Sequence, residues 1–406
     1  MIHVEEIRRD FPFFEDQPLA YLDNSATSQN PKCVMDAEWQ FYKDSNANPF
    51  RGIYDLSVRA TDAYEDSREV VRQFIHAKDP GEIIFTRNAS ESLNLVAYSF
   101  ASMVLKPGDE VLISIEEHHS NMLPWRAAAE RAGATVKYLD VDVTGLMTPE
   151  MVKEALTPKT RLFAVTQVSN IMGRTNDIKA FAKLCHENGT YLIADGAQSV
   201  PHMPVDVQDL DVDFLAFSGH KMLAPMGIGV LYGKREHLEK MPPFLTGGEM
   251  IETVTKQGQT YAELPHKFEA GTVNASGAVA LAAAIRYLQG IGFEDIMERE
   301  NALATRMMEG MKTVPHITVL GSEDPAEHHG IVTFKIDGVH PHDIAAIFAD
   351  QNIAVRAGHH CAQPLLAQVG IPNTTRASVM FYNTEEEVDR FLTVLGTIRG
   401  IMGYAD

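Results

Sequence analysis

One cysteine near the C-terminal end of the chain has neighbours that suit a sulfur nucleophile. The segment Arg356–Pro364 reads RAGHHCAQP and holds Cys361 between a glycine and a proline, among basic side chains. Imidazolium or guanidinium charge close to a partly open thiol favours the thiolate, which is the nucleophilic form. A cysteine in such a segment can equally fill a turn, so this motif alone leaves both interpretations open.

A carboxylate and a lysine follow two predicted strands that are neighbours in sequence. The strand 191–194 leads into Asp195-Gly-Ala-Gln198, and the strand 214–217 leads into Ser218-Gly-His-Lys221. In a pyridoxal phosphate site, a lysine forms an imine with the cofactor aldehyde and a carboxylate keeps the pyridine nitrogen protonated. Burial lowers the pKa of a lysine amine and makes it nucleophilic at neutral pH. A lone lysine is usually a solvated surface residue, but its place directly after an apolar strand favours the cofactor site.

Candidate groups for a phosphate and for an aromatic ring lie after two earlier strands. The segment 86–90 joins a strand to a helix, so backbone N–H groups and the Ser90 hydroxyl can meet an anion there. Ser218 and His220 flank the lysine and can complete this cup. After the strand 110–114, the histidine of Glu117-His118 can stack on a cofactor ring and exchange protons.

Short apolar strands alternate with helical patterns from about residue 60 to residue 235, which predicts an α/β fold. Continuous apolar strands separated by helices indicate a mostly parallel sheet that is covered on both faces. The predicted strands are 82–86, 110–114, 135–139, 162–166, 191–194, 214–217 and 229–232, and the helices between them include 90–103, 124–132, 149–156 and 177–188. Ligands bind such sheets at the carboxyl ends of the strands, where the candidate residues fall.

The chain of 406 residues is long enough for two domains. An alanine-rich helix from residue 275 and the helix 294–311 lead into a second strand-and-helix mixture: strands 317–320, 330–336 and 377–381, and helices 341–351 and 384–398. We predict a large cofactor-binding domain over residues 16–290, and a smaller domain over residues 1–15 and 291–406 that carries the cysteine loop.

Charge and cysteine content narrow the classes of partner. The formal net charge is −20, which argues against nucleic acid and anionic membranes as partners. No apolar stretch approaches the length of a transmembrane helix, and the N-terminus does not resemble a secretory signal. Three widely spaced cysteines predict a reducing, cytoplasmic location, with Cys33 and Cys185 in the core. No metal site is predicted.

Ordered segments along nearly the whole chain resemble the class V aminotransferase branch of fold-type I pyridoxal phosphate enzymes. More narrowly, they resemble the SufS-type (group II) cysteine desulfurases. The segments are 21–24 (YLDN), 60–65 (ATDAYE), 117–119 (EHH), 195–198 (DGAQ), 218–221 (SGHK), 268–272 (FEAGT) and 356–364 (RAGHHCAQP). The last is the most specific, because group I desulfurases carry their cysteine on a longer loop rich in serine and glycine.

The resemblance implies roles for individual residues around pyridoxal 5'-phosphate. Lys221 would hold the cofactor as an imine, Asp195 would pair with its ring nitrogen, and Gln198 would hydrogen-bond its phenolic oxygen. His118 would stack on the ring. The phosphate would be bound by the N–H of Ala89, by Ser90, Ser218 and His220, and by Thr272 of a second subunit in a homodimer.

Further roles concern the substrate and the sulfur. Arg376, with Asn170, would grip the substrate carboxylate, and Arg356 is a second candidate for this task or for stabilising the thiolate. Cys361 would attack the substrate sulfur and carry the persulfide. Ala89, Val273 and Tyr54 depart from residues common in relatives, and the change at Tyr54 concerns substrate or acceptor preference.

The predicted function is therefore conversion of L-cysteine to L-alanine with transfer of sulfur to Cys361, supplying iron–sulfur cluster assembly. One alternative is a selenocysteine lyase or a related β-eliminating enzyme. Another is a sulfur carrier or scaffold without cofactor chemistry. A sulfur-acceptor protein of the SufU or SufE type is the expected partner, with His342 as a candidate zinc ligand toward a SufU-type acceptor.

Overall fold

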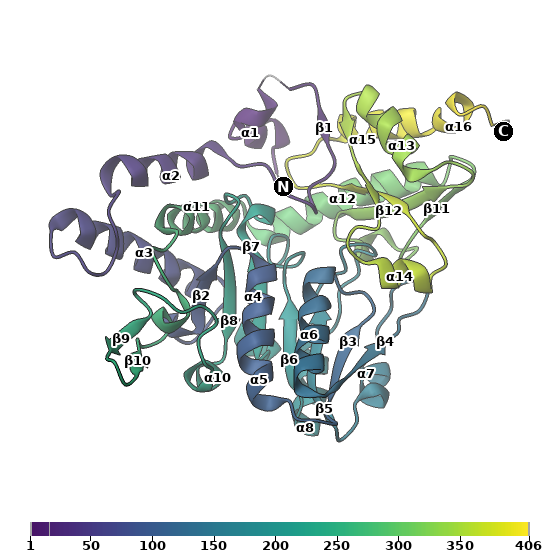
Figure 1. The fold of residues 1–406 in the computed structure, drawn as a ribbon. Helices are drawn as coiled ribbons and strands as arrows, with labels where there is room; N and C mark the ends of the chain where they lie inside the picture. Colours follow the sequence, from purple (N-terminus) through teal and green to yellow (C-terminus); the bar gives the residue numbers. More distant parts are fainter. Residues whose placement is uncertain (1, 16, 405–406) are drawn as a thin grey trace.

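A seven-stranded sheet forms the centre of the computed structural model, which describes residues 2–15 and 17–404 (Figure 1). Its strand order is β2-β8-β7-β6-β5-β3-β4, and only β8 runs antiparallel to its neighbours. The strands are β2 (Ile83–Thr86), β3 (Glu110–Ser114), β4 (Thr135–Leu139), β5 (Thr160–Thr166), β6 (Tyr191–Asp195), β7 (Phe214–Ser218) and β8 (Gly229–Gly233). The predicted mostly parallel α/β sheet is confirmed.

The central strands are buried on both faces, as their continuous apolar sequences require. In β5, Phe163 and Val165 belong to one apolar cluster, whereas Leu162 and Ala164 belong to a second cluster on the other face. Alternate side chains of a strand point to opposite faces, so both faces need a covering layer. The helices of this part of the chain are α2 (Lys32–Asp44), α3 (Asp55–Phe74), α4 (Ala89–Leu95), a π-helical turn (Val96–Phe100), α5 (Ala101–Val104), α6 (Leu123–Ala132), α7 (Pro149–Ala155), α8 (Ile178–Asn188), α9 (Val207–Leu210), α10 (Arg235–Lys240) and α11 (Ala275–Ile291).

A smaller four-stranded sheet, in the order β11-β12-β15-β14, lies beyond the carboxyl ends of the large sheet's parallel strands (Figure 1). Its strands are β11 (Ile317–Val319), β12 (Ile331–Ile336), β14 (Arg356–Gly358) and β15 (Thr374–Ser378). The helices around it are α12 (Phe293–Met311), α13 (Pro341–Asp350), α14 (Gln363–Gln368), α15 (Glu385–Leu395) and α16 (Ile398–Ile401). A third apolar cluster, with Phe334, Phe348 and Phe391, fills the space between this sheet and its helices.

The N-terminal segment belongs spatially to this second part. Strand β1 (Ala20–Tyr21) pairs in parallel with β13 (Ile353–Ala354), and helix α1 (Val4–Arg8) is tied by an ion pair from Arg8 to Glu387. A separate hairpin, β9 (Ile251–Val254) and β10 (Gln259–Tyr261), projects from the large part (Figure 1). Met1, the first residue of the predicted small domain, and Asp16, the first residue of the predicted large domain, lie outside the described residues.

Two sequence expectations are wrong. The last strand of the small sheet covers 374–378 instead of 377–381, because the apolar residues after Ser378 pack into the core beyond the strand, and Arg376 lies within the strand. Cys185 is buried as predicted, but Cys33, in the first turn of α2, is exposed. Within the described residues, no helix combines the length and apolar content needed to cross a membrane.

Candidate active site

Twelve of the predicted site residues meet around one cavity of about 290 Å³ at the carboxyl ends of the central strands. They are Ala89, Ser90, His118, Asn170, Asp195, Gln198, Ser218, His220, Lys221, Arg356, Cys361 and Arg376. The volume is near the lower end of the range for small-molecule sites. Thr272 is exposed and does not line this cavity.

Lys221 and Asp195 form the floor of the cavity. Asp195 is the last residue of β6, and Lys221 follows the end of β7. These two adjacent parallel strands are buried along almost their whole lengths. Burial lowers the pKa of the Lys221 amine to about 8, and Arg376 adds to the shift while Asp195 opposes it. Burial also raises the pKa of Asp195, whose carboxylate accepts the Ala197 N–H at 2.9 Å. The sheet therefore holds an amine that readily gives up its proton near an acid.

The predicted phosphate residues lie where α4 begins. The Ala89 N–H donates to the Ser218 hydroxyl oxygen at 2.9 Å, and the hydroxyl oxygens of Ser90 and Ser120 are 2.6 Å apart. Asn88 caps α4 by accepting the Glu91 N–H. Small polar groups and a helix N-terminus thus converge at one end of the cavity, which suits an anion.

His118 is held as a neutral imidazole. Burial lowers its pKa to about 3, and the positive charges of Lys221 and Arg376 contribute. Its Nδ1 accepts the Ser120 N–H at 3.1 Å, so the ring proton is on Nε2. The neighbouring Glu117 is buried and anchors this loop by accepting the Thr166 N–H at 2.8 Å. In the Glu117-His118 motif, the imidazole thus lines the cavity, whereas the carboxylate anchors the loop.

The cysteine loop enters the cavity from the opposite side. His360 and Cys361 both have left-handed backbone conformations, with φ of 49° and 57°, which non-glycine residues rarely adopt. Two hydrogen bonds from the large part hold them: the Asn170 amide donates to the His360 carbonyl at 2.8 Å, and the His119 N–H donates to the Cys361 carbonyl at 2.7 Å. The Cys361 side chain is exposed at the cavity.

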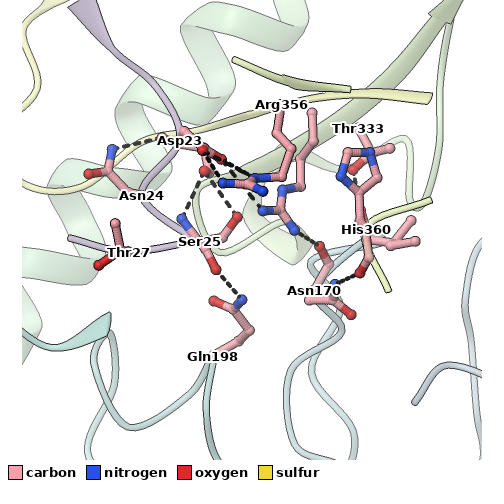
Figure 2. A network of polar contacts seen from close by, with 12 residues as sticks. Asp23, Asn24, Ser25, Thr27, Asn170, Gln198, Thr333, Arg356 and His360 are labelled. Atoms are coloured by element: carbon pink, nitrogen blue, oxygen red, sulfur yellow. Dashed lines mark hydrogen bonds and ion pairs between the residues drawn. The ribbon is translucent and has the colours of Figure 1, made fainter. Parts of the chain in front are cut away.

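Two arginines from the small sheet, Arg356 and Arg376, complete this side of the cavity, and Figure 2 shows Arg356. Arg376 is 3 % exposed and donates to the Asn170 carbonyl at 2.8 Å. Burial lowers its pKa to about 10, so it stays positively charged at neutral pH. Arg356 is more exposed, and its guanidinium group donates to the Asp23 carboxylate.

These residues fit pyridoxal phosphate. An aldehyde needs the amine of Lys221, a pyridinium nitrogen needs the acid Asp195, and a phosphate needs the donors at the start of α4. Gln198 supports the same conclusion, because its buried Oε1 lacks a hydrogen-bond partner among the residues that the structure describes. A ligand that donates to this oxygen would satisfy it.

Comparison with known proteins decides the family. The profile of the family "Aminotransferase class-V" matches residues 20–391. The chain belongs to this family. It is 44% identical to a probable cysteine desulfurase of Halalkalibacterium halodurans, over 99% of this chain and 100% of that protein. It is 43% identical to a cysteine desulfurase of Pectobacterium atrosepticum, over 98% and 99% of the two chains.

Solved structures of family members have the same fold. The cysteine desulfurase CsdA of Escherichia coli aligns with a TM-score of 0.92 and 38% identity, covering 99% of both chains. The apo cysteine desulfurase of Thermococcus onnurineus aligns with a TM-score of 0.94 and 40% identity, covering 98% of this chain and 99% of that one. The predicted fold-type I architecture of pyridoxal phosphate enzymes is therefore confirmed.

The structure adds cavity residues that sequence reasoning missed. Ser25, Ser120, Thr166 and His360 also line the cavity. Two of them could have been predicted from the sequence, since Ser120 follows the paired histidines and His360 precedes the cysteine. Ser25 could not, because its place depends on the long-range contact between its carbonyl oxygen and the Gln198 amide, at 2.8 Å.

Proposed function

We propose that this class-V family member is a pyridoxal phosphate-dependent cysteine desulfurase. The observation that carries the proposal is one cavity in which an exposed thiol, Cys361, faces a buried amine and acid, Lys221 and Asp195. Sequence identity of 43–44% to proteins named cysteine desulfurases, over almost the full chain, supports the same reaction. L-Cysteine and the Cys361 thiol would give L-alanine and the Cys361 persulfide.

The residues divide the chemistry between them. Bound in this cavity, pyridoxal phosphate would supply an aldehyde carbon and an electron-accepting ring. Arg376 binds the substrate carboxylate, and Lys221 moves the proton at the substrate's α-carbon. The Cys361 thiolate attacks the substrate sulfur, so that an S–S bond forms while the bond between that sulfur and the β-carbon breaks. The electron pair of the broken bond stays with the carbon, which takes up a proton to become the methyl group of alanine.

Mass spectrometry of cysteine-containing peptides tests this proposal. After incubation of the holoenzyme with L-cysteine, we expect one added sulfur atom on the peptide that contains Cys361. Cys33 is also exposed but does not line the cavity, so its peptide is an internal control for general reactivity. Equal labelling of both peptides, or none at Cys361, would contradict the proposal.

Selenocysteine lyase or a related β-elimination is the second candidate, since it uses the same buried amine and acid. Selenium leaves carbon more readily than sulfur does, so such an enzyme does not require a persulfide on Cys361. A Cys361→Ala variant that retains full activity with L-selenocysteine, in a protein with weak activity toward L-cysteine, would favour this candidate. A non-enzymatic scaffold would instead show no cofactor absorption band.

We infer that the active enzyme is a homodimer. Large apolar side chains are exposed on neighbouring segments of the large part: Trp39, Tyr42, Ile53, Tyr54 and Met226. Exposed apolar surface of this extent is typical of an interface. Thr272 is exposed outside the cavity, which fits a role toward the phosphate of a second subunit. Sedimentation of the wild type and of a Trp39→Glu variant tests this assignment.

The sulfur acceptor and the compartment complete the proposal. We place the protein in the SufS-type group, with transfer to a SufU- or SufE-type protein in the cytosol for iron–sulfur cluster assembly. Support comes from the cysteines, since all three lie in the described chain as free thiols. His342 is exposed near the start of α13, where a zinc-bearing acceptor can reach it. If His342→Ala leaves stimulation by a zinc-bearing acceptor unchanged, a zinc-free SufE-type partner is favoured.

A further inference from the structure

Two positive charges face each other across the small sheet at the substrate end of the cavity. Arg356 in β14 and Arg376 in β15 are directly opposite each other in an antiparallel pair. Like charges in opposite positions destabilise such a pair. A compensating negative charge is therefore required near both side chains, and the N-terminal segment provides it.

Asp23 lies against both guanidinium groups, and Figure 2 shows it beside Arg356. Its Oδ2 accepts from Arg356 Nη2 at 2.8 Å and from Nε at 3.1 Å, and its Oδ1 is 3.7 Å from Arg376 Nη2. The Asp23 side chain is only 14% exposed. Its backbone is fixed by a parallel bridge to Ser378, and the next residue, Asn24, donates to the Ser378 carbonyl at 2.8 Å. This carboxylate is thus held in place against the two arginines that line the cavity.

The charges at this end of the cavity sum to one positive charge, from two guanidinium groups and one carboxylate. One positive charge matches one substrate carboxylate. Asp23 occupies two donors of Arg356, whereas Arg376 is left to meet the α-carboxylate. A second anionic group on the substrate therefore finds the nearby guanidinium already paired. Cys361 also lies near both arginines.

We propose that Asp23 is a specificity-determining residue that favours amino acids with one anionic group over dianionic ones. It sets this preference by pairing with Arg356, and so discriminates against side chains such as sulfinate or carboxylate. The inference rests on the proposed function, because it assumes that Arg376 receives the substrate carboxylate.

Binding of L-alanine and L-aspartate to the holoenzyme tests the proposal. The two ligands differ by one carboxylate, and neither has sulfur to transfer, so the comparison does not depend on desulfurase activity. Calorimetric titration should show that Asp23→Asn raises the affinity for aspartate relative to alanine by at least about tenfold. The bare charge effect at this distance is larger, but Arg356 is about half exposed and solvent screens it.

Two further variants separate charge from folding. Arg356→Gln should shift the preference in the opposite direction, toward alanine, because it removes a positive charge and leaves Asp23 unpaired beside Arg376. The double variant Asp23→Asn/Arg356→Gln restores one net positive charge and should return the affinity ratio close to that of the wild type. The cofactor absorption band and the melting temperature identify variants that fold.

Activity provides a second readout. The ratio of kcat/KM for L-cysteine sulfinate to that for L-cysteine should rise in Asp23→Asn and fall in Arg356→Gln. Equal losses for both ligands in Asp23→Asn, or shifts in the same direction in the two single variants, would overturn the proposal. If Asp23→Asn does not fold, an unchanged affinity ratio in Arg356→Gln overturns it. Absence of sulfur release by the wild type would instead refute the proposed function and leave the binding result standing.

Discussion

The two walls of the cavity are built in different ways. Lys221 and Asp195 lie at the ends of adjacent strands in the middle of the large sheet, and these strands are buried on both faces. Cys361 lies on an exposed loop of the small sheet, where two consecutive non-glycine residues have positive φ. The wall that faces the cofactor (the fixed wall) is thus set by the core. The wall that carries the cysteine (the sulfur wall) is held by a few hydrogen bonds from the large part.

The sulfur wall needs its hydrogen bonds to the large part because its backbone conformation is energetically unfavourable. A left-handed conformation costs on the order of 1–3 kcal/mol for each non-glycine residue. The hydrogen bonds from Asn170 and from the His119 backbone each contribute about 1 kcal/mol and offset part of this cost. Loops held by few contacts open at low free energy, which suits a group that must receive sulfur and then present it to another protein.

The largest effect is expected from the fixed wall. We predict that Lys221→Ala lowers kcat with L-cysteine by about a thousandfold or more, since the proposed transfer of the α-proton goes through this amine. The absorption band of the lysine-bound cofactor should vanish in the same variant. Lys153→Ala, an exposed lysine on α7, is the matched control and should behave as the wild type. Turnover above a tenth of the wild-type rate would refute the role of Lys221.

Removing the nucleophile from the sulfur wall should abolish sulfur transfer and leave cofactor binding intact. Cys361→Ala should retain the cofactor band and the spectral response to L-cysteine, but sulfide release with dithiothreitol should fall to background. The thiol is exposed and contributes little to packing, so the fixed wall should survive its loss. Cys33→Ala is the control for an exposed cysteine elsewhere. A variant that loses the cofactor would show that Cys361 is structural.

A smaller effect is expected where the two walls meet the substrate. Arg376→Ala should raise KM for L-cysteine by tens- to thousands-fold, because truncating a buried guanidinium–carboxylate pair costs roughly 2–5 kcal/mol. The absorption band without substrate should stay unchanged. Arg356→Ala provides the comparison, and a larger rise of KM in that variant would assign the carboxylate to Arg356.

The sequence predicts the fixed wall better than the sulfur wall. Lys221 and Asp195 follow apolar strands, and parallel strands bring their carboxyl ends to one edge, so local patterns sufficed. Cys361 was identified from a contiguous motif. The pairing of Asp23 with the arginines was out of reach, because it depends on the β14–β15 register and on a contact between residues more than 300 positions apart.

Some errors have the same origin. Residues 377–381 form an apolar run that resembles a strand, but the strand ends at Ser378 because the later residues turn into the core. Cys33 was predicted in the core, yet the exposed face of α2 carries it. In both cases the sequence showed an apolar or helical pattern, whereas tertiary packing decided which residues it covers.

The smallest effect concerns a carboxyl group behind the fixed wall. Glu116 is buried after β3, and burial raises its pKa from its usual value near 4.5 to about 7. The folded state then holds a proton that the unfolded state has lost between these two pH values, so stability decreases as the pH rises through this window. Glu116→Gln should remove that decrease, which amounts to about 1–3 kcal/mol.

Denaturant unfolding at pH 5 and at pH 8 measures this difference. The wild type should lose more stability between the two pH values than Glu116→Gln does, whereas the exposed control Glu150→Gln should match the wild type. An identical pH dependence in Glu116→Gln and the wild type would show that Glu116 is ionised in the folded protein, held by contacts such as that with the Asn176 amide.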